Sequence, residues 1–428
     1  MGGIGEKTAR GFNRATQALR QTGSAGKPIA VLAPAIDKQI ITASTIYVDE
    51  ATTFDDGTQE GYSPTDYNDY RGAITVRQAV ESSQNIPFVK IMEQLTPKES
   101  INYMKKLGIT TLTQKDDNLN LALGGLDKGI SPLEMAAAYS TIANDGTYIE
   151  PTFYTTAENS SGKTVVKSTQ KKKKVMSEAV AYILQSILTE PVTGPKGTAN
   201  YCKISGIDVA AKTGTTNDEY DRWLCGFTPY YTAVTWFGFD LNETINFNGK
   251  NPSGQIWSNV MKTIHSGLAN KEFDIPKSGI ETANICSKTG LLANSSCSSY
   301  YEYYVKGTAP TTYCNEHSGS QKTTTTQETP STSTTSPETT PSVETQTQNN
   351  NFPNTETPVQ NSTSSPVQNN TATIENTVSN TNTASTQNTT VEPPAVTPEE
   401  PAQTTNTVTN TAIEIEDDFS SNDNTFEQ

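Results

Sequence analysis

A change in composition near Ser318 limits how much of this chain can fold. From there to Gln428 the sequence is almost wholly Thr, Ser, Asn, Gln, Pro and Glu, with a single lysine, Lys322, and 14 acidic residues. Such a segment buries too little apolar surface to offset the entropy that is lost when it becomes ordered. We therefore expect a disordered tail over residues 318–428, acting as a tether or spacer, and a folded part within residues 1–317.

Charge and hydropathy exclude several classes of function. The net charge is −15, and the tail carries 1 − 14 = −13 of it. Residues 1–317 hold 30 basic and 32 acidic side chains, so we expect no nucleic-acid partner. The sequence has no run of about 18 apolar residues and no basic, apolar signal pattern at its start, which predicts neither a membrane span nor export by itself. Gly162-Lys163-Thr164 lacks the first glycine of a phosphate loop, and we predict no cofactor.

The strongest candidate site is the Ser24-Ala25-Gly26-Lys27 stretch, which directly precedes an apolar run over residues 29–36. Ser24 and Lys27 are three residues apart, so in a helix they lie on the same face and can share a proton. Pro28 suits the first turn of a helix, and Gly23 allows a sharp bend into it. The alternative interpretation is that Ser24 only caps the helix.

A turn between two predicted helices carries Ser83 and Asn85. Apolar spacing predicts a helix over residues 75–83, with Thr75 as its cap. Pro87 disfavours helical backbone in the residue before it, so a turn separates this helix from the next one. Such a turn exposes Ser83 and Asn85 side by side; the alternative is that both only cap helix ends.

The last third of the folded part changes to a strand pattern. Lys212-Thr213-Gly214-Thr215 ends the first of three apolar, β-rich segments, and Thr213 and Thr215 share one face because the strand period is two. The three segments are residues 209–216, 222–227 and 231–239, and their short connections predict an antiparallel meander. A helix or helix pair is predicted at residues 88–107, and further helices are predicted at residues 131–143, 177–188 and 253–268. The predicted fold class is α+β, an antiparallel sheet flanked by helices.

Five cysteines fall into two groups. Cys202 and Cys225 lie in or beside apolar, strand-like runs and are interpreted as core thiols. Residues 285–317 are rich in Tyr, Ser and Gly and show no helical or strand period strong enough for a core. They contain the other three cysteines: Cys286, Cys297 and Cys314. A disulfide is the favoured interpretation there if the domain lies outside the cytoplasm. Zinc bound with the help of His317 is less favoured, because no Cys-x-x-Cys motif is present, and no metal site is predicted.

Three motifs together carry a resemblance to a known family. Ser24-x-x-Lys27, Ser83-x-Asn85 and Lys212-Thr213-Gly214 occur in the order that is the signature of penicillin-binding proteins and serine β-lactamases. The flanking matches are Phe12-Asn13-Arg14-Ala15-Thr16, Ala122-Leu123-Gly124-Gly125, Ser131-Pro132-Leu133-Glu134-Met135-Ala136 and the continuation Thr215-Thr216-Asn217. Over roughly residues 10–270 the chain resembles the transpeptidase domain of bifunctional (class A) penicillin-binding proteins. A second Lys-Thr-Gly, at residues 288–290, has no strand before it and is not counted as a binding motif.

The resemblance implies a domain organisation and a role for the first two motifs. It implies a transpeptidase domain over residues 1–270, a small Cys/Tyr-rich extension over 271–317 and the tail over 318–428. Ser24 is implied as the nucleophile and Lys27 as the base that takes its proton, with its pKa lowered by the neighbouring Lys212. Ser83 relays a proton toward the leaving amine, and Asn85 fixes the peptide bond of the substrate.

The third motif is implied to bind the end of the substrate. Lys212 supplies positive charge, and the hydroxyls of Thr213 and Thr215 suit a terminal carboxylate. Gly214 lets the substrate lie close along the strand edge. The backbone N–H groups of Ser24 and Thr215 form the implied oxyanion hole.

The implied substrate is the D-alanyl-D-alanine end of a peptidoglycan stem peptide, cross-linked through a serine acyl-enzyme. β-Lactam antibiotics acylate the same serine, so they are the second implied partner. The implied location is the extracytoplasmic face of a bacterial cell, with a cell-wall contact through the tail.

Three alternatives stay open from the sequence. A D,D-carboxypeptidase shares all three motifs, and a wall-binding surface protein without activity would keep the fold. A β-lactamase needs a carboxylate to activate water, and the one nominal candidate is Glu99 with Asn102 on a predicted exposed helix face. Family members begin with a strand pair ahead of the loop at residues 2–3, so we expect a carboxyl-terminal piece of a larger anchored protein whose sheet lacks its first strands.

Overall fold

The computed structural model describes residue 3 and residues 11–247 and 249–317. The predicted tail lies outside the described residues. The elements are, in chain order, a 3-10 turn Gly23–Gly26, a π-helical segment Pro28–Leu32, α1 Ala33–Asp37, β1 Ile46–Asp49, β2 Gly72–Thr75, α2 Val76–Ser82, α3 Ile86–Leu95, α4 Pro97–Lys106, α5 Pro132–Ala143, β3 Thr147–Ile149, β4 Thr156–Glu158, β5 Thr164–Lys167, β6 Lys172–Lys174, α6 Glu178–Thr193, β7 Ala210–Thr215, β8 Asp221–Phe227, β9 Thr232–Gly238, α7 Pro252–Ile264, β10 Ile280–Cys286 and β11 Ser299–Val305.

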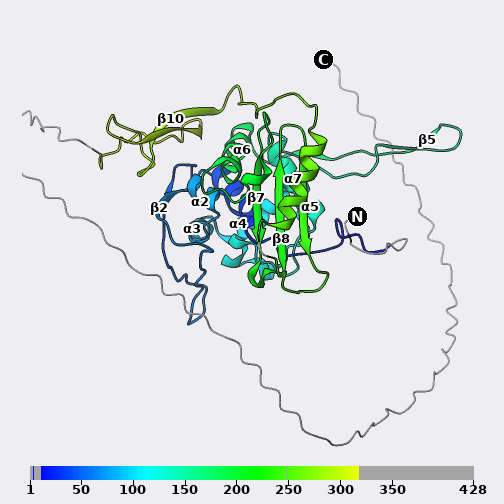
Figure 1. Ribbon diagram of the computed structural model, residues 1–428, viewed down its shortest axis with the longest axis horizontal. Helices are drawn as coiled ribbons and strands as arrows, with labels where there is room; N and C mark the ends of the chain where they lie inside the picture. Colours follow the sequence, from blue (N-terminus) through cyan, green and yellow to red (C-terminus); the bar gives the residue numbers. More distant parts are fainter. Residues whose placement is uncertain (1–2, 4–10, 248, 318–428) are drawn as a thin grey trace, which may run out of the picture. The chain divides into compact units, whose positions relative to one another are not determined.

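The predicted meander forms the central sheet, in the antiparallel order β7-β8-β9 with β7 at one edge. Figure 1 shows β7 and β8 of this sheet side by side. Strand alternation divides the side chains of the sheet between two apolar clusters. Trp223 and Cys225 join the main core with α5, whereas Leu224 between them packs with Trp257 of α7. The sheet is therefore covered by helices on both faces, and the predicted α+β class is confirmed.

The helix that follows Ser24 runs through the main core, and its irregular start has a cause in the sequence. Pro34 has no N–H, so it cannot donate to the carbonyl of Ala30 one turn earlier. The buried Ser100 hydroxyl of α4 donates to that carbonyl instead, at 2.6 Å. A hydrogen bond from a neighbouring helix therefore replaces one that the proline removes, and it ties α4 to the Ser24 helix.

Most of the predicted helices are present with shifted ends. α2 begins after Thr75, whose side chain accepts from the N–H of Gln78 as a cap. Of the two alternatives predicted over 88–107, a helix or a helix pair, the structure shows the pair, α3 and α4. The break lies at Thr96, which has φ +72 and caps α4, because Pro97 disfavours helical backbone in the residue before it.

The prediction that residues 285–317 lack strand order was wrong. β10 and β11 pair antiparallel along their full length. The buried face of β11 carries Glu302, whose carboxylate binds the guanidinium of Arg77 at 2.6 and 2.7 Å. Burial of a charge depends on this distant partner, so a hydropathy pattern could not reveal it. All five cysteines are free thiols, and the expected disulfide is not formed.

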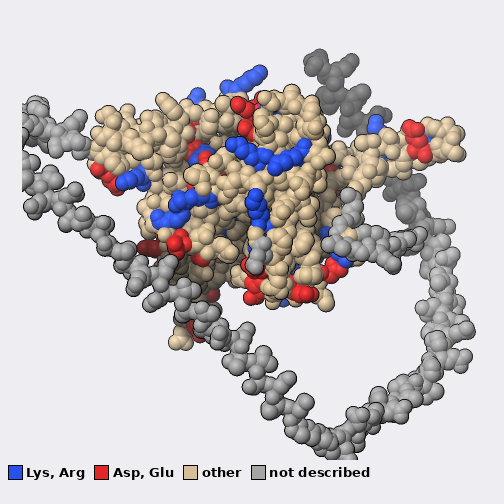
Figure 2. Space-filling model, viewed as in Figure 1, with Lys and Arg blue, Asp and Glu red and all other residues tan. Residues whose placement is uncertain are grey.

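Two surface features complete the fold. The strands β4, β5 and β6 are exposed, and β4 pairs with β5 while β3 pairs with β6. On the face in Figure 2, Lys and Arg lie in several separate groups with Asp and Glu between them. No helix among the described residues has the length and apolar character that crossing a bilayer requires.

Candidate active site

Ser24 is positioned by a close approach of its turn to the end of β7. Gly23 adopts φ +51, and a Cβ there would lie 2.3 Å from the carbonyl oxygen of Thr215. Only glycine tolerates both the conformation and the contact. Gly214 is equally constrained, because its Cβ would lie 2.4 Å from the carbonyl oxygen of Thr22. Gly214 thus admits the Ser24 turn itself, a packing constraint in addition to the substrate contact that the sequence suggested.

Lys27 is fully buried next to the turn that the second motif forms. Its ammonium donates to the carbonyl oxygens of Ser83 and Gln84, at 2.9 and 2.8 Å, and to Oδ1 of Asn85 at 2.7 Å. It also lies 4.7 Å from the centre of the Phe88 ring. All three N–H bonds of the ammonium are therefore used.

The electrostatics of Lys27 favour its neutral form. Burial lowers the pKa of Lys27 well below the usual value, and the charge of Lys212 lowers it further. Among the hydrogen bonds of the described residues, none joins Lys27 to the Ser24 hydroxyl. Since a neutral amine keeps two N–H bonds and gains a lone pair, deprotonation must release one of the three acceptors.

Ser83 and Lys212 meet directly. Ser83 ends α2 in the left-handed conformation, with φ 63, which places it at the turn predicted before Pro87. The Lys212 ammonium, fully buried under the groove, donates to the Ser83 hydroxyl at 2.7 Å. Burial lowers the pKa of Lys212 to about 7. The second and third motifs are therefore joined by a hydrogen bond between two groups that can exchange a proton.

The three motifs open on one groove of about 540 Å³. Its lining includes, from the predicted site, Ser24, Ser83, Asn85, Thr213 and Thr215. Thr213 and Thr215 are both partly exposed on the same face of the edge strand β7. The groove thus runs past the serine hydroxyl and along a strand edge.

Two groups of the groove were missed by the sequence reasoning. Arg222 donates to the Thr215 hydroxyl at 3.2 Å from the neighbouring strand β8 and also pairs with Glu219 at 2.9 Å. Asp66 accepts a hydrogen bond from the backbone N–H of Asn85. Burial, together with a hydrogen bond to Asp49, raises the pKa of Asp66 to about 7. The sheet register places Arg222 opposite Thr215, so a correct pairing of the two predicted strands would have found it.

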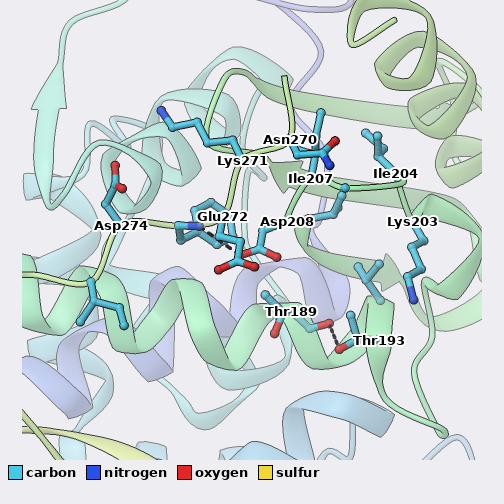
Figure 3. Close-up of a pocket in the computed structure, with 15 residues that line it drawn as sticks. Thr189, Thr193, Lys203, Ile204, Ile207, Asp208, Asn270, Lys271, Glu272 and Asp274 are labelled. Carbon is cyan, nitrogen blue, oxygen red and sulfur yellow. Dashed lines mark hydrogen bonds between the residues drawn. The ribbon is translucent and has the colours of Figure 1, made fainter. Parts of the chain in front are cut away.

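A second hollow, of about 830 Å³, lies between α6 and the segments 203–209 and 270–275 (Figure 3). It contains none of the motif residues. Its central carboxylate, Asp208, accepts from the backbone N–H of Phe273 at 3.0 Å. The chemistry of the three motifs is therefore confined to the groove beside β7.

Comparison with known proteins gives the same assignment. Residues 6–262 match the model of the penicillin binding protein transpeptidase domain, and residues 276–319 match that of the C-terminal domain of penicillin-binding protein 1A. Penicillin-binding protein 1A of Clostridium botulinum is 34% identical over 337 residues, which are 75% of this chain and 40% of that protein. The chain thus spans well under two thirds of that relative.

Solved structures agree with the match. Penicillin-binding protein 1A from Haemophilus influenzae has a TM-score of 0.63 and 26% identity, covering 71% of this chain and 50% of that one. The PonA1 protein from Mycobacterium tuberculosis, solved in complex with penicillin V, shares the fold, with a TM-score of 0.54 and 24% identity over 63% of this chain and 76% of that one. By its sequence, its fold and the placement of its three motifs, the chain belongs to the family of penicillin-binding proteins, through their transpeptidase domain.

Proposed function

We propose that this chain is a D,D-transpeptidase that cross-links peptidoglycan stem peptides through an acyl-enzyme on Ser24. The observation that carries the proposal is the contact of Lys212 with the Ser83 hydroxyl at 2.7 Å, beside a buried Lys27 that binds the same turn. The Ser83 residue is thus bound by two amines of lowered pKa, Lys27 at its carbonyl oxygen and Lys212 at its hydroxyl. Such a pair suits a reaction that first removes a proton and later returns one.

Acylation starts with the attack of Ser24 Oγ on the carbonyl carbon of the penultimate D-alanine. Neutral Lys27 takes the hydroxyl proton, and the N–H groups of Ser24 and Thr215 bind the developing oxyanion. The C–N bond to the terminal D-alanine then breaks. Ser83 gives its proton to the leaving amine and receives one from Lys212, with which it is hydrogen-bonded.

Deacylation runs the same proton path in reverse. The amine of a neighbouring stem peptide attacks the ester carbon, and its proton passes through Ser83 to Lys212. Lys27 returns its proton to Ser24 Oγ as the ester bond breaks. All groups end in their starting protonation states, and one amide has replaced another.

Substrate binding is assigned to the strand edge. Thr213 and Thr215 present hydroxyls toward the groove, and Arg222 beside Thr215 adds a charge suited to a terminal carboxylate. Asn85 is held by Lys27 and by the carbonyl of Thr65, to which its amide donates at 2.7 Å. We propose that this fixed amide orients the peptide bond of the substrate.

The domain organisation and location belong to the same proposal. Residues 1–270 form the transpeptidase domain and 271–317 its extension, at the extracytoplasmic face of a bacterial cell. The proposed partners are stem peptides ending in D-alanyl-D-alanine and β-lactam antibiotics. We also propose a cell-wall contact through residues 318–428, a segment that lies outside the described residues.

The structure gives no support to the β-lactamase alternative. Glu99, its nominal water-activating group, pairs with Lys38 at 2.6 Å on an exposed part of α4. It does not line the groove.

Product analysis separates the remaining alternatives. The chain is incubated with a stem pentapeptide, with and without an added D-amino acid as acceptor amine. We expect release of D-alanine together with incorporation of the acceptor. Release with hydrolysis alone identifies a carboxypeptidase, and no release from folded protein identifies a wall-binding protein without activity.

A further inference from the structure

Four sulfur and nitrogen ligands meet in the extension, far along the chain from the three motifs. We call them the Cys–His cluster: Cys286, Cys297, Cys314 and His317. Each offers one ligand atom, and these atoms all lie within 4.8 Å of one another. Nδ1 of His317 lies 3.5, 3.6 and 3.1 Å from the sulfurs of Cys286, Cys297 and Cys314 respectively. The cluster uses residues from three separate parts of the extension.

These distances fit a tetrahedral metal site. With Zn–S bonds of about 2.3 Å and a Zn–N bond of about 2.0 Å, ideal tetrahedral angles separate two sulfurs by about 3.8 Å and a sulfur from the nitrogen by about 3.5 Å. The sulfur–nitrogen distances lie close to the second value. A disulfide would use only two of the thiols, whereas one metal ion would bind all three sulfurs and the imidazole.

One asparagine ties two of the ligand-bearing segments together. The backbone N–H of Asn294 donates to the sulfur of Cys297 at 3.4 Å, and the Asn294 side-chain amide donates to the carbonyl oxygen of Cys314 at 2.8 Å. Such contacts around a metal site orient its ligands. Cys314-x-x-His317 supplies two ligands from one short segment, in place of the Cys-x-x-Cys motif that the sequence lacks.

This arrangement also explains the second Lys-Thr-Gly motif. The Thr289 hydroxyl accepts from the backbone N–H of Leu291 at 3.4 Å, and Gly290 turns the chain with φ +67. Gly290 packs so closely on the body of the protein that a Cβ would lie 2.1 Å from the carbonyl oxygen of Ser44. The Ser44 hydroxyl also donates to the Gly290 carbonyl at 3.2 Å and accepts from Tyr304 of β11 at 2.7 Å. The turn therefore attaches the extension just ahead of β1.

We propose that the Cys–His cluster binds one Zn²⁺ ion in a tetrahedral site with a structural role. Four protein ligands leave no open position for substrate, which is typical of a structural rather than a catalytic zinc. The extension is a short module with few large buried side chains, and modules of this size commonly need a metal or disulfide to stay folded. The ion fixes the turn at residues 286–290, of which Ser287 and Lys288 line a hollow that also contains Ser82 and Gln84 near the active groove.

The test measures metal and thiols in the full chain. Protein produced with added Zn²⁺ is dialysed, and its zinc content is determined by elemental mass spectrometry. Wild type and the control Cys202→Ala, which removes a buried thiol outside the cluster, should each hold about one zinc per chain. Cys297→Ser and His317→Ala should lose it. Asn294→Ala, which removes the amide that binds the carbonyl oxygen of Cys314, should weaken zinc binding by about 10- to 100-fold.

Cobalt provides an independent readout of geometry. Metal-free wild type titrated with Co²⁺ should develop the intense visible bands of a tetrahedral ion and thiolate charge-transfer bands, and His317→Ala should not develop the wild-type spectrum. Three results would each overturn the proposal. Wild type could hold no zinc after loading, the cluster variants could hold as much zinc as wild type, or the intact mass could be lower by two hydrogen atoms because a disulfide has formed. Labelling of Ser24 by penicillin is scored separately, because the zinc site does not depend on the proposed function.

Discussion

Substitution of Gly214 by alanine tests whether the Ser24 turn is held against β7 as the structure shows. The new Cβ would lie 2.4 Å from the carbonyl oxygen of Thr22 and 2.9 Å from the Cβ of Ala25. Both neighbours belong to the turn around Ser24, and one of them is backbone, which cannot rotate away. The turn must therefore move off the strand by roughly 1 Å to restore ordinary van der Waals contact.

The displacement has two expected costs. Overpacking of a buried site lowers the free energy of unfolding by about 1–3 kcal/mol. Moving Ser24 by about 1 Å relative to the strand edge lowers the rate of acylation by about 100-fold, because the serine and the oxyanion donors then no longer meet one carbonyl group. In protein that stays folded, a loss of stability alone would not slow acylation by this much.

The assay compares the second-order rate of acylation by a labelled penicillin with the denaturant midpoint of each variant. Gly226→Ala is the matched control: it lies in β8 of the same sheet, and its Cβ would also be crowded, at 3.0 Å from the Ala210 carbonyl oxygen and from other atoms. It should lose stability but keep the rate of acylation within a few-fold of wild type. A Gly214→Ala variant that reacts as fast as Gly226→Ala would refute the argument.

Three further predictions concern buried polar groups. Ser100→Ala should lower the free energy of unfolding by about 1–3 kcal/mol in urea titrations, because the Ala30 carbonyl loses the hydrogen bond from Ser100. A loss of unfolding free energy no larger than that of the exposed control Ser161→Ala would contradict this. Arg77→Met should cost about 3–5 kcal/mol by leaving the Glu302 carboxylate buried and unpaired, and the double variant with Glu302→Gln should recover part of the loss. The pKa of Lys212 is about 7 in the folded protein and higher in the unfolded chain, so the unfolded chain binds more protons between these values and stability should rise with pH above about 7. Lys212→Met should lack this part of the pH dependence. An equal pH dependence of stability in both proteins would show that the ammonium is not desolvated.

The sequence predicted those parts of the site that depend on local chain geometry. The predicted turn between two helices is present at Ser83, and the strand period placed Thr213 and Thr215 together. The packing of Gly214 against the Ser24 turn was not predicted, because the approach of Thr22 to β7 is a tertiary contact that leaves no mark in the residues around Gly214.

Other features depend on partners that are distant in sequence. Glu302 is buried beside Arg77, which lies 225 residues away in the sequence, so the Tyr-rich segment of β11 with its central glutamate did not look like a buried strand. Asp66 acts on Asn85 from a loop without a recognisable period. The four residues of the Cys–His cluster are also distant in sequence, and the pairing of β10 with β11 helps to bring them together.

Intact-mass spectrometry of the whole chain after incubation with penicillin tests the central claim most directly. Wild type should gain the mass of one penicillin, located by peptide mapping on Ser24, and the adduct should persist after excess drug is removed. Ser24→Ala should gain nothing while it unfolds at the same denaturant concentration as wild type within about 1 kcal/mol. Folded wild type without an adduct, or an adduct that persists in Ser24→Ala, would contradict the assignment of Ser24 as the nucleophile.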